Sequence, residues 1–330
     1  CRPMSYQPEL HTLHASLSSS LCATLGKPRP LVYDHGAHPL EDLPAHVRAA
    51  SSIRRQGSRL VILQDDVSAL AVLDPSTGST YPILLPAGPD GARVFDDTRG
   101  NKKFKMDLEA CVVLPDSRLV AFGSGSSPQR EKIVTVAPGK GAMAQQMSGE
   151  DLYAGLRAHS DPRGARLNIE GAVVQGEWLR LLQRGNGKRG FEPWNAILDV
   201  ALDKFLGWLD GRHPFPPVRR IFEVHLGALA GVPFGFTDAA VTDDGRVAFL
   251  ACAEDTEDAL IDGPVTGCRF GWLGADDQSV VVAPVVDGEG KRTHLKLEGI
   301  EARTGGGTMF DVVADMDRGD EPAQIADLFV

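Results

Sequence analysis

A four-residue phrase recurs five times along this chain of 330 residues, at intervals near sixty residues. In four copies the phrase carries a carboxylate, and a short apolar run, a turn and a second apolar run follow it. The copies are Ala50-Ser51-Ser52-Ile53, Asp107-Leu108-Glu109-Ala110, Asn168-Ile169-Glu170-Gly171, Phe236-Thr237-Asp238-Ala239 and Lys296-Leu297-Glu298-Gly299. Their anchor positions 51, 109, 170, 238 and 298 are 58, 61, 68 and 60 residues apart. Such a period is typical of repeat architectures, so it constrains the fold before any local assignment.

Each repeat divides into short segments rich in Val, Leu, Ile and Phe, separated by Gly, Asp and Pro turns, which is the pattern of β-strands. The predicted strands are 51–55, 59–64, 68–73 and 80–85; 108–113, 118–123, 132–137 and 142–147; 169–174, 178–183, 194–200 and 218–226; 238–242, 246–252, 268–273 and 279–286; and 298–303, 309–315 and 323–329. Helices are predicted only over 148–158, with Ser148 as N-cap, and over 201–209.

This arrangement predicts an all-β protein, a single β-propeller of four-stranded blades. Five blades are expected, and a sixth, degenerate blade within 1–50 or 141–165 stays open, as does a pair of β-sandwiches. Because the fifth repeat lacks one strand, closing the ring requires a strand from the N-terminal segment 1–45, around Leu31–Tyr33. The propeller domain would then span residues 46–330.

Bulk composition narrows the possible partners. The formal net charge of −10 argues against nucleic acid, because a duplex-binding protein needs a basic surface. No run of eighteen apolar residues exists, so no membrane span is expected. Five scattered cysteines without a CxxC pair suggest buried thiols, as at Cys111 and Cys252, and a reducing compartment. Together with the lack of a visible signal peptide this favours the cytoplasm, although the start at Cys1 leaves processing open. A monomer is expected.

The recurring acids predict a metal site. In an antiparallel meander the start of the first strand and the end of the second lie on the same face. Acids at these two places would therefore gather around the axial mouth of the disc, where their repulsion requires a compensating cation. Oxygen ligands of this kind suit Ca²⁺, with other divalent cations also possible. The predicted ligands are Glu109, Glu170, Asp238, Glu298, Asp65 and Asp66. Ser51 replaces the acid in the first repeat, so the ring of acids is incomplete.

Cations and an amide are expected at the same mouth. We interpret Lys103, Arg130, Arg184 and Asn186 as candidates for binding an anionic group of a small-molecule ligand in the central channel. The alternative is that these side chains only balance the acids as ion pairs. The sequence contains no P-loop, GxSxG or HExxH motif, and its nine histidines form no recognisable catalytic set.

Several phrases resemble an uncharacterised bacterial β-propeller family that is distantly related to phytase-like and SdiA-regulated-type propellers. They are Lys105-Met106-Asp107-Leu108-Glu109-Ala110, Asn168-Ile169-Glu170-Gly171-Ala172, Phe236-Thr237-Asp238-Ala239-Ala240 and Leu297-Glu298-Gly299-Ile300. The resemblance covers about 46 to 330. It implies a propeller with a central-channel site, and calcium is common among such relatives. It transfers no catalytic mechanism.

The sequence therefore favours a metal-dependent hydrolase of small phosphate esters or lactones. Metal-bound water would be the nucleophile, and one of Glu109, Glu170 or Glu298 the general base. The competing interpretation is a non-catalytic propeller that binds a ligand or a protein, in which the acids fix contacts between blades.

Overall fold

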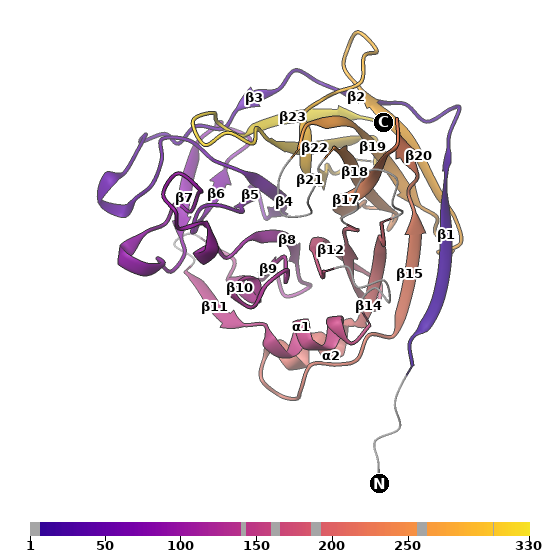
Figure 1. Ribbon diagram of the computed structural model, residues 1–330, viewed down its shortest axis with the longest axis horizontal. Helices are drawn as coiled ribbons and strands as arrows, with labels where there is room; N and C mark the ends of the chain where they lie inside the picture. The colour runs from indigo at the N-terminus through magenta and orange to yellow at the C-terminus, as the bar shows by residue number, and fades with distance from the viewer. Residues whose placement is uncertain (1–6, 140–142, 160–165, 186–192, 256–262, 306) are drawn as a thin grey trace.

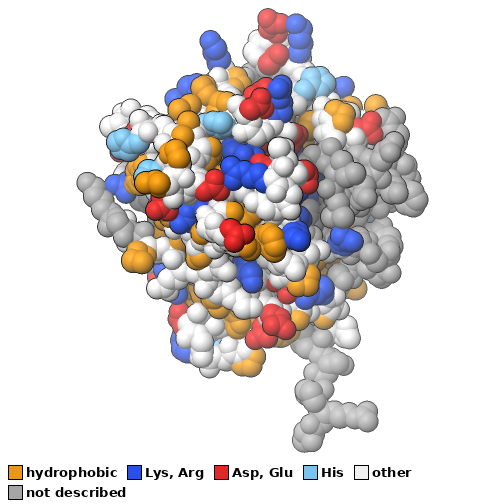
Figure 2. Space-filling model, turned by 60° about the vertical axis from the view of Figure 1, so that its left-hand side comes forward, with side chains coloured by type: hydrophobic (Ala, Val, Ile, Leu, Met, Phe, Trp, Pro, Cys, Tyr) orange, Lys and Arg blue, Asp and Glu red, His pale blue; other side chains and the backbone are white. Residues whose placement is uncertain are grey.

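β-Strands make up most of the regular structure in the computed structural model, as the sequence predicts. The structure describes residues 7–139, 143–159, 166–185, 193–255, 263–305 and 307–330. Neither of its two α-helices is long and apolar enough to cross a bilayer within these ranges. On the face shown in Figure 2, acidic and basic side chains are intermixed, with apolar side chains scattered between them.

Four of the predicted repeats form antiparallel meanders in which each strand pairs with the next. They are β4 (Ala50–Gln56), β5 (Arg59–Gln64), β6 (Ala69–Leu73) and β7 (Thr80–Leu84); β8 (Leu108–Val113), β9 (Leu119–Gly123), β10 (Lys132–Val136) and β11 (Ala144–Ser148); β12 (Ile169–Gln175), β13 (Trp178–Gln183), β14 (Ala196–Ala201) and β15 (Arg220–His225); and β17 (Val232–Val241), β18 (Val247–Glu254), β19 (Val265–Leu273) and β20 (Val280–Val286), with the short β16 (Ala228–Leu229) beside β17. The fifth repeat supplies β21 (Lys296–Ala302), β22 (Met309–Asp315) and β23 (Gln324–Phe329).

The first strands of the five repeats surround a common centre. Close contacts link β4 to β8, β8 to β12, β12 to β17, β17 to β21, and β21 to β4 again. Figure 1 shows these strands in the middle of the disc, with β7, β11, β15 and β20 toward its rim. The result is a propeller-like arrangement in which the first strand of every repeat faces the axis.

The N-terminal segment runs along the rim and joins successive sheets. β1 (Glu9–Leu17) pairs in parallel with β15 and then with β20. β2 (Ala23–Leu25) pairs with β20 and β23, and β3 (Arg29–Pro30) pairs with β23. Figure 1 shows β1 along one side of the disc and β2 and β3 beside β23. These strands protect edges that would otherwise be unpaired.

The strand expected around Leu31–Tyr33 at the edge of the fifth repeat lies slightly earlier in the chain, and the Leu31 amide continues the contact by donating to the carbonyl oxygen of Ala323 at 2.9 Å. β2 and β3, which lie earlier in the chain, are the segments that pair with β23. Val32 makes only an isolated bridge to His46. Leu31 and Tyr33 are buried in a cluster formed by the first and fifth repeats, and Val32 is exposed.

The two predicted helices are present. They are α1 (Glu150–Arg157) and α2 (Leu202–Leu209), and short 3-10 turns occur at η1 (Pro39–Glu41), η2 (Pro89–Gly91), η3 (Lys102–Phe104) and η4 (Pro128–Arg130). The N-cap is Gly149 rather than Ser148, whose Oγ still accepts a hydrogen bond from the Glu150 amide at 3.3 Å. Tyr153 of α1 and Phe205 of α2 lie in one buried cluster with the third repeat, so the helices cover its core.

A one-residue bulge interrupts the pairing between the first and second strands of every repeat. The register shifts once in each of the pairs β4–β5, β8–β9, β12–β13, β17–β18 and β21–β22. A bulge leaves one residue unpaired and turns its side chain away from the regular alternation. The residues that are skipped are Ser51, Glu109, Glu170, Thr237 and Glu298.

The bulges correct the sequence alignment of the fourth repeat. There the skipped residue is Thr237, so Asp238 does not correspond to Glu109. It occupies the next position, which Ser52, Ala110, Gly171 and Gly299 hold in the other repeats. Because neighbouring residues of a strand face opposite ways, a slip of one residue places the Asp238 side chain in a different environment.

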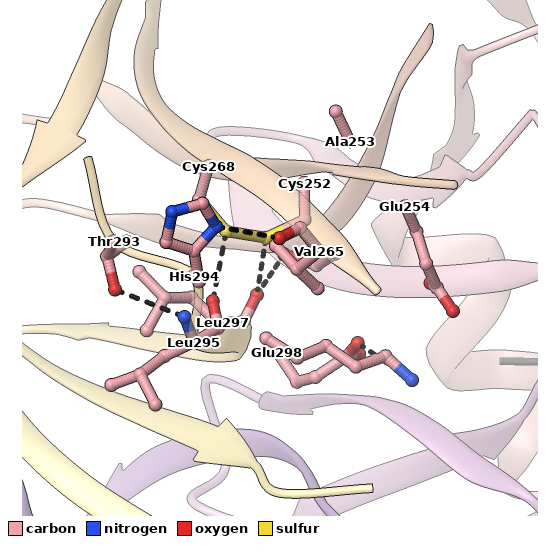
Figure 3. Close-up of a disulfide and its surroundings, with 12 residues drawn as sticks. Cys252, Ala253, Glu254, Val265, Cys268, Thr293, His294, Leu295, Leu297 and Glu298 are labelled. Carbon is pink, nitrogen blue, oxygen red and sulfur yellow. Dashed lines mark hydrogen bonds and ion pairs between the residues drawn. A yellow bond between two sulfur atoms is a disulfide. The ribbon is translucent and has the colours of Figure 1, made fainter. Parts of the chain in front are cut away.

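Cys252 is not the free thiol that was expected. It forms a disulfide with Cys268, directly opposite on the neighbouring strand β19, whereas Cys22 and Cys111 are free. Figure 3 shows this disulfide beside the backbone of Leu295 and Leu297. The pairing removes the argument that the cysteines indicate a reducing compartment.

Asp238 and Arg54 form a buried pair that ties several first strands together. Asp238 is fully buried, and its carboxylate accepts from Arg54 Nη2 at 2.7 Å, from Ser52 Oγ at 3.0 Å and from the amide of Ile300 at 3.1 Å. The Arg54 guanidinium also donates to the carbonyl oxygens of Ala172, Ala239 and Ile300. One side chain of β4 thus contacts β12, β17 and β21.

We predict that Arg54→Met lowers the free energy of unfolding by about 3–5 kcal/mol, because it leaves the Asp238 carboxylate buried without its cation. Urea unfolding of the wild type and variant measures this change. Arg118→Met is the matched control, since its pairs with Asp116 and Asp210 lie at the surface. That control should lose less than about 1 kcal/mol. Equal losses in the two variants would contradict the role assigned to the buried pair.

Candidate metal centre

Three buried glutamates meet at the centre of the disc. Glu109 on β8, Glu170 on β12 and Glu298 on β21 each offer a carboxylate oxygen, and these oxygens lie within 4.8 Å of one another. The three residues are 9%, 4% and 4% exposed. All three are bulge residues, so the same local distortion of three strands directs them toward one point.

The other two bulge residues carry hydroxyl groups in place of carboxylates. Ser51 Oγ donates to the carbonyl oxygen of Leu108 at 2.5 Å, and Thr237 Oγ1 donates to that of Leu297 at 2.7 Å. Each hydroxyl therefore satisfies the backbone of the neighbouring first strand. The circle of five positions contains three carboxylates and two neutral groups, rather than four carboxylates.

A second acidic group adjoins the first through Glu109. Carboxylate oxygens of Asp65, Asp107 and Glu109 lie within 4.8 Å of one another. Asp107 has ion pairs with Lys105 at 2.5 Å and Arg130 at 2.9 Å, and Asp65 accepts from Lys105 at 2.7 Å. Asp65 and Asp107 are therefore compensated by cations, whereas Glu109 makes no hydrogen bond or ion pair with any residue that the structure describes.

Arg184 is the main cation beside the three glutamates. Its guanidinium lies 2.6 Å from Glu254, 3.7 Å from Glu170 and 3.9 Å from Glu298. Gly235 makes room for it, because a Cβ at that position would lie 2.8 Å from Arg184 Cγ. Figure 3 shows Glu254 and Glu298 below the disulfide. Arg184 thus links the acids of three repeats without forming a close pair with Glu298.

Lys296 is a second cation at the centre. Its ammonium lies 3.6 Å from Glu298 and 3.1 Å from Asp317. Glu298 Oε1 nevertheless has no hydrogen-bond partner among the described residues, although it is buried. A buried carboxylate oxygen without a donor costs free energy unless a ligand or a proton satisfies it.

Burial makes these glutamates difficult to ionise. Burial raises the pKa of Glu170 to about 7, although Arg184 and Lys296 oppose the shift. Burial, followed by repulsion from Asp107, raises the pKa of Glu109 well above its usual range. Burial also raises the pKa of Glu298 well above that range, against the attraction of Lys296. The cluster therefore favours either protons or a bound cation.

Two of the remaining predicted ligands, Asp238 and Asp66, pair with arginine side chains instead. Both oxygens of Asp238 accept from Arg54. Asp66 pairs with Arg48 at 2.6 Å and lines a neighbouring cavity of about 210 Å³, which Asp65 and Asp315 also line. Burial raises the pKa of Asp66 to about 7 and that of Asp315 to about 8.

The predicted substrate-binding residues lie in two places. Arg184 is at the centre, whereas Lys103 and Arg130 line a pocket at its edge. Asn186 lies outside the described residues. The sequence reasoning missed Lys105, Asp107 and Lys296, which surround the glutamates. Their positions two to four residues before an anchor are the signal that could have identified them.

We predict that the metal-free protein loses stability as the pH rises from about 4.5 toward 7. The pKa of Glu170 in the folded protein is about 7 against 4.5 for an ordinary glutamate, so the folded state holds more protons in this window. The free energy of unfolding then falls with rising pH. Glu170→Gln should reduce this fall, as urea unfolding in EDTA at a series of pH values will measure. An unchanged pH dependence in the variant would contradict the assigned pKa shift.

Comparisons with known proteins place the chain in a family. Similar solved structures include a glutaminyl cyclase from Myxococcus xanthus, with a TM-score of 0.47, 11% identity, and coverage of 98% of this chain and 99% of that chain. They also include a gluconolactonase from Xanthomonas campestris, with a TM-score of 0.42, 10% identity, and coverage of 95% and 99%. The RRP9 WD40 repeats have a TM-score of 0.41, 8% identity, and coverage of 92% and 99%. No curated protein matches the sequence. A family model matches residues 46–330, and the chain therefore belongs to the family of unknown function DUF6929.

Proposed function

We propose that Glu109, Glu170 and Glu298 bind a divalent cation, preferentially Ca²⁺, at the centre of a five-bladed propeller. The observation that carries this proposal is the convergence of three buried carboxylates around an oxygen, Glu298 Oε1, that no described donor satisfies. Each of the five repeats would form one blade. β2 and β3 would complete the fifth, since they pair with β23.

The spacing of the carboxylates fits a calcium ion. Calcium–oxygen distances are about 2.4 Å, so two ligands on opposite sides of the ion are about 4.8 Å apart. The oxygens of the three glutamates lie within that separation. Both groups of candidate ligands found among the described residues contain carboxylates alone, and such ligands suit Ca²⁺ or Mg²⁺ better than zinc. Calcium takes about six to eight oxygens, so three glutamates leave positions for water and for a ligand.

Charge supports the same assignment. Three carboxylates that share a desolvated site repel one another. Arg184 lies 3.7 Å from Glu170 and 3.9 Å from Glu298, and Lys296 lies 3.6 Å from Glu298. A divalent cation between the carboxylates compensates them far more closely. Binding would release the protons that burial holds on these groups, so the affinity for calcium should increase with pH.

We propose further that the centre hydrolyses small phosphate esters or lactones. A bound divalent cation supplies polarisation of a phosphoryl or carbonyl oxygen and favours deprotonation of water. Glu109 is the best placed proton acceptor, because it is the one of the three glutamates whose side chain makes no hydrogen bond or ion pair with a described residue. Arg184 would stabilise negative charge that develops on the substrate. The proton leaves water for the Glu109 carboxylate, and the same group can return it to the leaving oxygen.

The competing function is a non-catalytic ligand-binding or protein-interaction propeller. The observation that favours it is the ion-pair network, in which Arg184 joins Glu254 to Glu170 and Glu298 and so fastens three repeats together. In that case the acids would stabilise contacts between blades and no turnover would occur.

We predict that calcium raises the melting temperature of the wild type by about 4 °C at a concentration about 100 times its dissociation constant. The protein must first be freed of metal with a chelator. Glu298→Gln should abolish most of the shift, because it removes one ligand charge. Glu289→Gln, an exposed glutamate paired only with Lys291, is the matched control and should keep the full shift. A shift of equal size in both variants would place calcium elsewhere.

We predict that Glu109→Gln lowers the rate of hydrolysis by about 100-fold or more and also reduces the calcium-induced shift, because Glu109 is one of the three proposed ligands. A panel of phosphate esters and lactones, assayed at saturating calcium, measures the rates. Glu289→Gln again serves as the control. Equal rates for Glu109→Gln and the wild type would remove Glu109 from the mechanism. If calcium raises the melting temperature of the wild type but the wild type hydrolyses none of these compounds, the non-catalytic propeller is favoured.

A further inference from the structure

A second pocket at the edge of the metal centre carries the opposite charge. It has a volume of about 330 Å³, and its lining includes Lys103, Phe104, Ser126, Ser127, Arg130 and Arg166. We propose that this pocket binds the phosphate group of a small aromatic phosphate monoester, with the aromatic part against Phe104. The pocket would bind phosphate without the metal, and its part in catalysis rests on the proposed function.

The charge of the pocket is unusual for this chain. The protein has 44 acidic and 34 basic residues, yet the described lining contains three cations and no carboxylate. Several cations around one small volume repel one another unless an anion joins them. Two hydroxyl groups, from Ser126 and Ser127, add donors that a phosphate with its several acceptor oxygens can use.

The cations of the pocket have N–H groups that donate to no acceptor among the described residues. Arg130 contacts Asp107 and Ser126, each at 2.9 Å, through Nη1 alone, which leaves Nε and Nη2 for a ligand. The Arg166 side chain is exposed and pairs with no residue in the described part of the chain. Lys103 lies over the Phe104 ring, 5.0 Å from its centroid, and has no carboxylate partner in the described ranges. Three cationic side chains from three separate segments therefore line the pocket.

Phe104 suggests what the anion is attached to. It ends the short turn η3 and is 42% exposed, although a large apolar side chain is normally more deeply buried. An aromatic group attached to the phosphate would cover this ring, which the Lys103 ammonium already contacts from one side. A ligand with a flat apolar group next to its phosphate fits this combination better than inorganic phosphate.

One ion pair connects the pocket to the metal centre. Arg130 in the pocket pairs with Asp107, whose carboxylate lies within 4.8 Å of those of Asp65 and Glu109. A phosphate held by Arg130 would therefore stand next to the acidic group that adjoins the three glutamates. This placement narrows the proposed substrate class from phosphate esters or lactones to aromatic phosphate monoesters.

Binding of phenyl phosphate, inorganic phosphate and benzoate to protein in EDTA tests the proposal, with isothermal titration calorimetry as the readout. Phenyl phosphate should bind to the wild type, and the double variant Lys103→Gln/Arg166→Gln should bind it about tenfold more weakly. Arg130 is left unchanged because it pairs with Asp107. Phe104→Ala should weaken phenyl phosphate about threefold and leave inorganic phosphate unaffected. Lys27→Gln/Lys204→Gln removes two exposed cations elsewhere and should bind like the wild type.

Three results would overturn the proposal. They are no binding of phenyl phosphate up to about 10 mM, equal affinity in the wild type and the Lys103→Gln/Arg166→Gln variant, and benzoate binding as tight as that of phenyl phosphate. The double variant should keep the calcium-induced rise in melting temperature, because it leaves the glutamates intact. If the protein binds phenyl phosphate but calcium does not raise its melting temperature, only the proposal of the metal centre is refuted. The two proposals can therefore be tested independently.

Discussion

The bulge in each first strand is the constraint on which the site depends. A regular strand would alternate its side chains between two faces, and the glutamates would point into the sheet interfaces. By skipping one residue in the pairing with the second strand, β8, β12 and β21 direct Glu109, Glu170 and Glu298 toward the same point. In the fifth repeat the position that follows is Gly299, where a Cβ would lie 3.0 Å from the Ile53 amide of the first repeat. The distortion and the close packing of first strands therefore belong together.

The structure contains two buried groups of charged side chains that are compensated to different degrees. Asp238 meets Arg54 at hydrogen-bond distance, and burial raises the pKa of Asp238 while Arg54 and two backbone amides oppose that shift. The pair is complete and joins four first strands. The three glutamates lack such a partner, since their nearest cations remain beyond hydrogen-bond distance. The pair of Asp238 and Arg54 stabilises the fold. The three glutamates leave negative charge that a bound cation can compensate.

The sequence predicted the repeats, most strands and both helices, because these follow from apolar periodicity and turn residues. It also placed Glu109, Glu170 and Glu298 at equivalent positions. It failed at Asp238, because aligning carboxylates overlooked the bulge, and Thr237 is the true counterpart. It failed at the N-terminus, where β1 and β2 pair with distant strands that no local pattern reveals. The Cys252–Cys268 disulfide likewise depends on the register of β18 and β19.

The central claim is that three glutamates from three repeats share one cation. Anomalous scattering from crystals grown with Mn²⁺ or soaked with a calcium-mimicking lanthanide tests it most directly, because the signal locates the ion among named oxygens. We expect a peak between the carboxylates of Glu109, Glu170 and Glu298, with oxygen distances of about 2.0–2.6 Å. A fully formed channel with no peak at that point, or with a peak bound only by other acids, would contradict it.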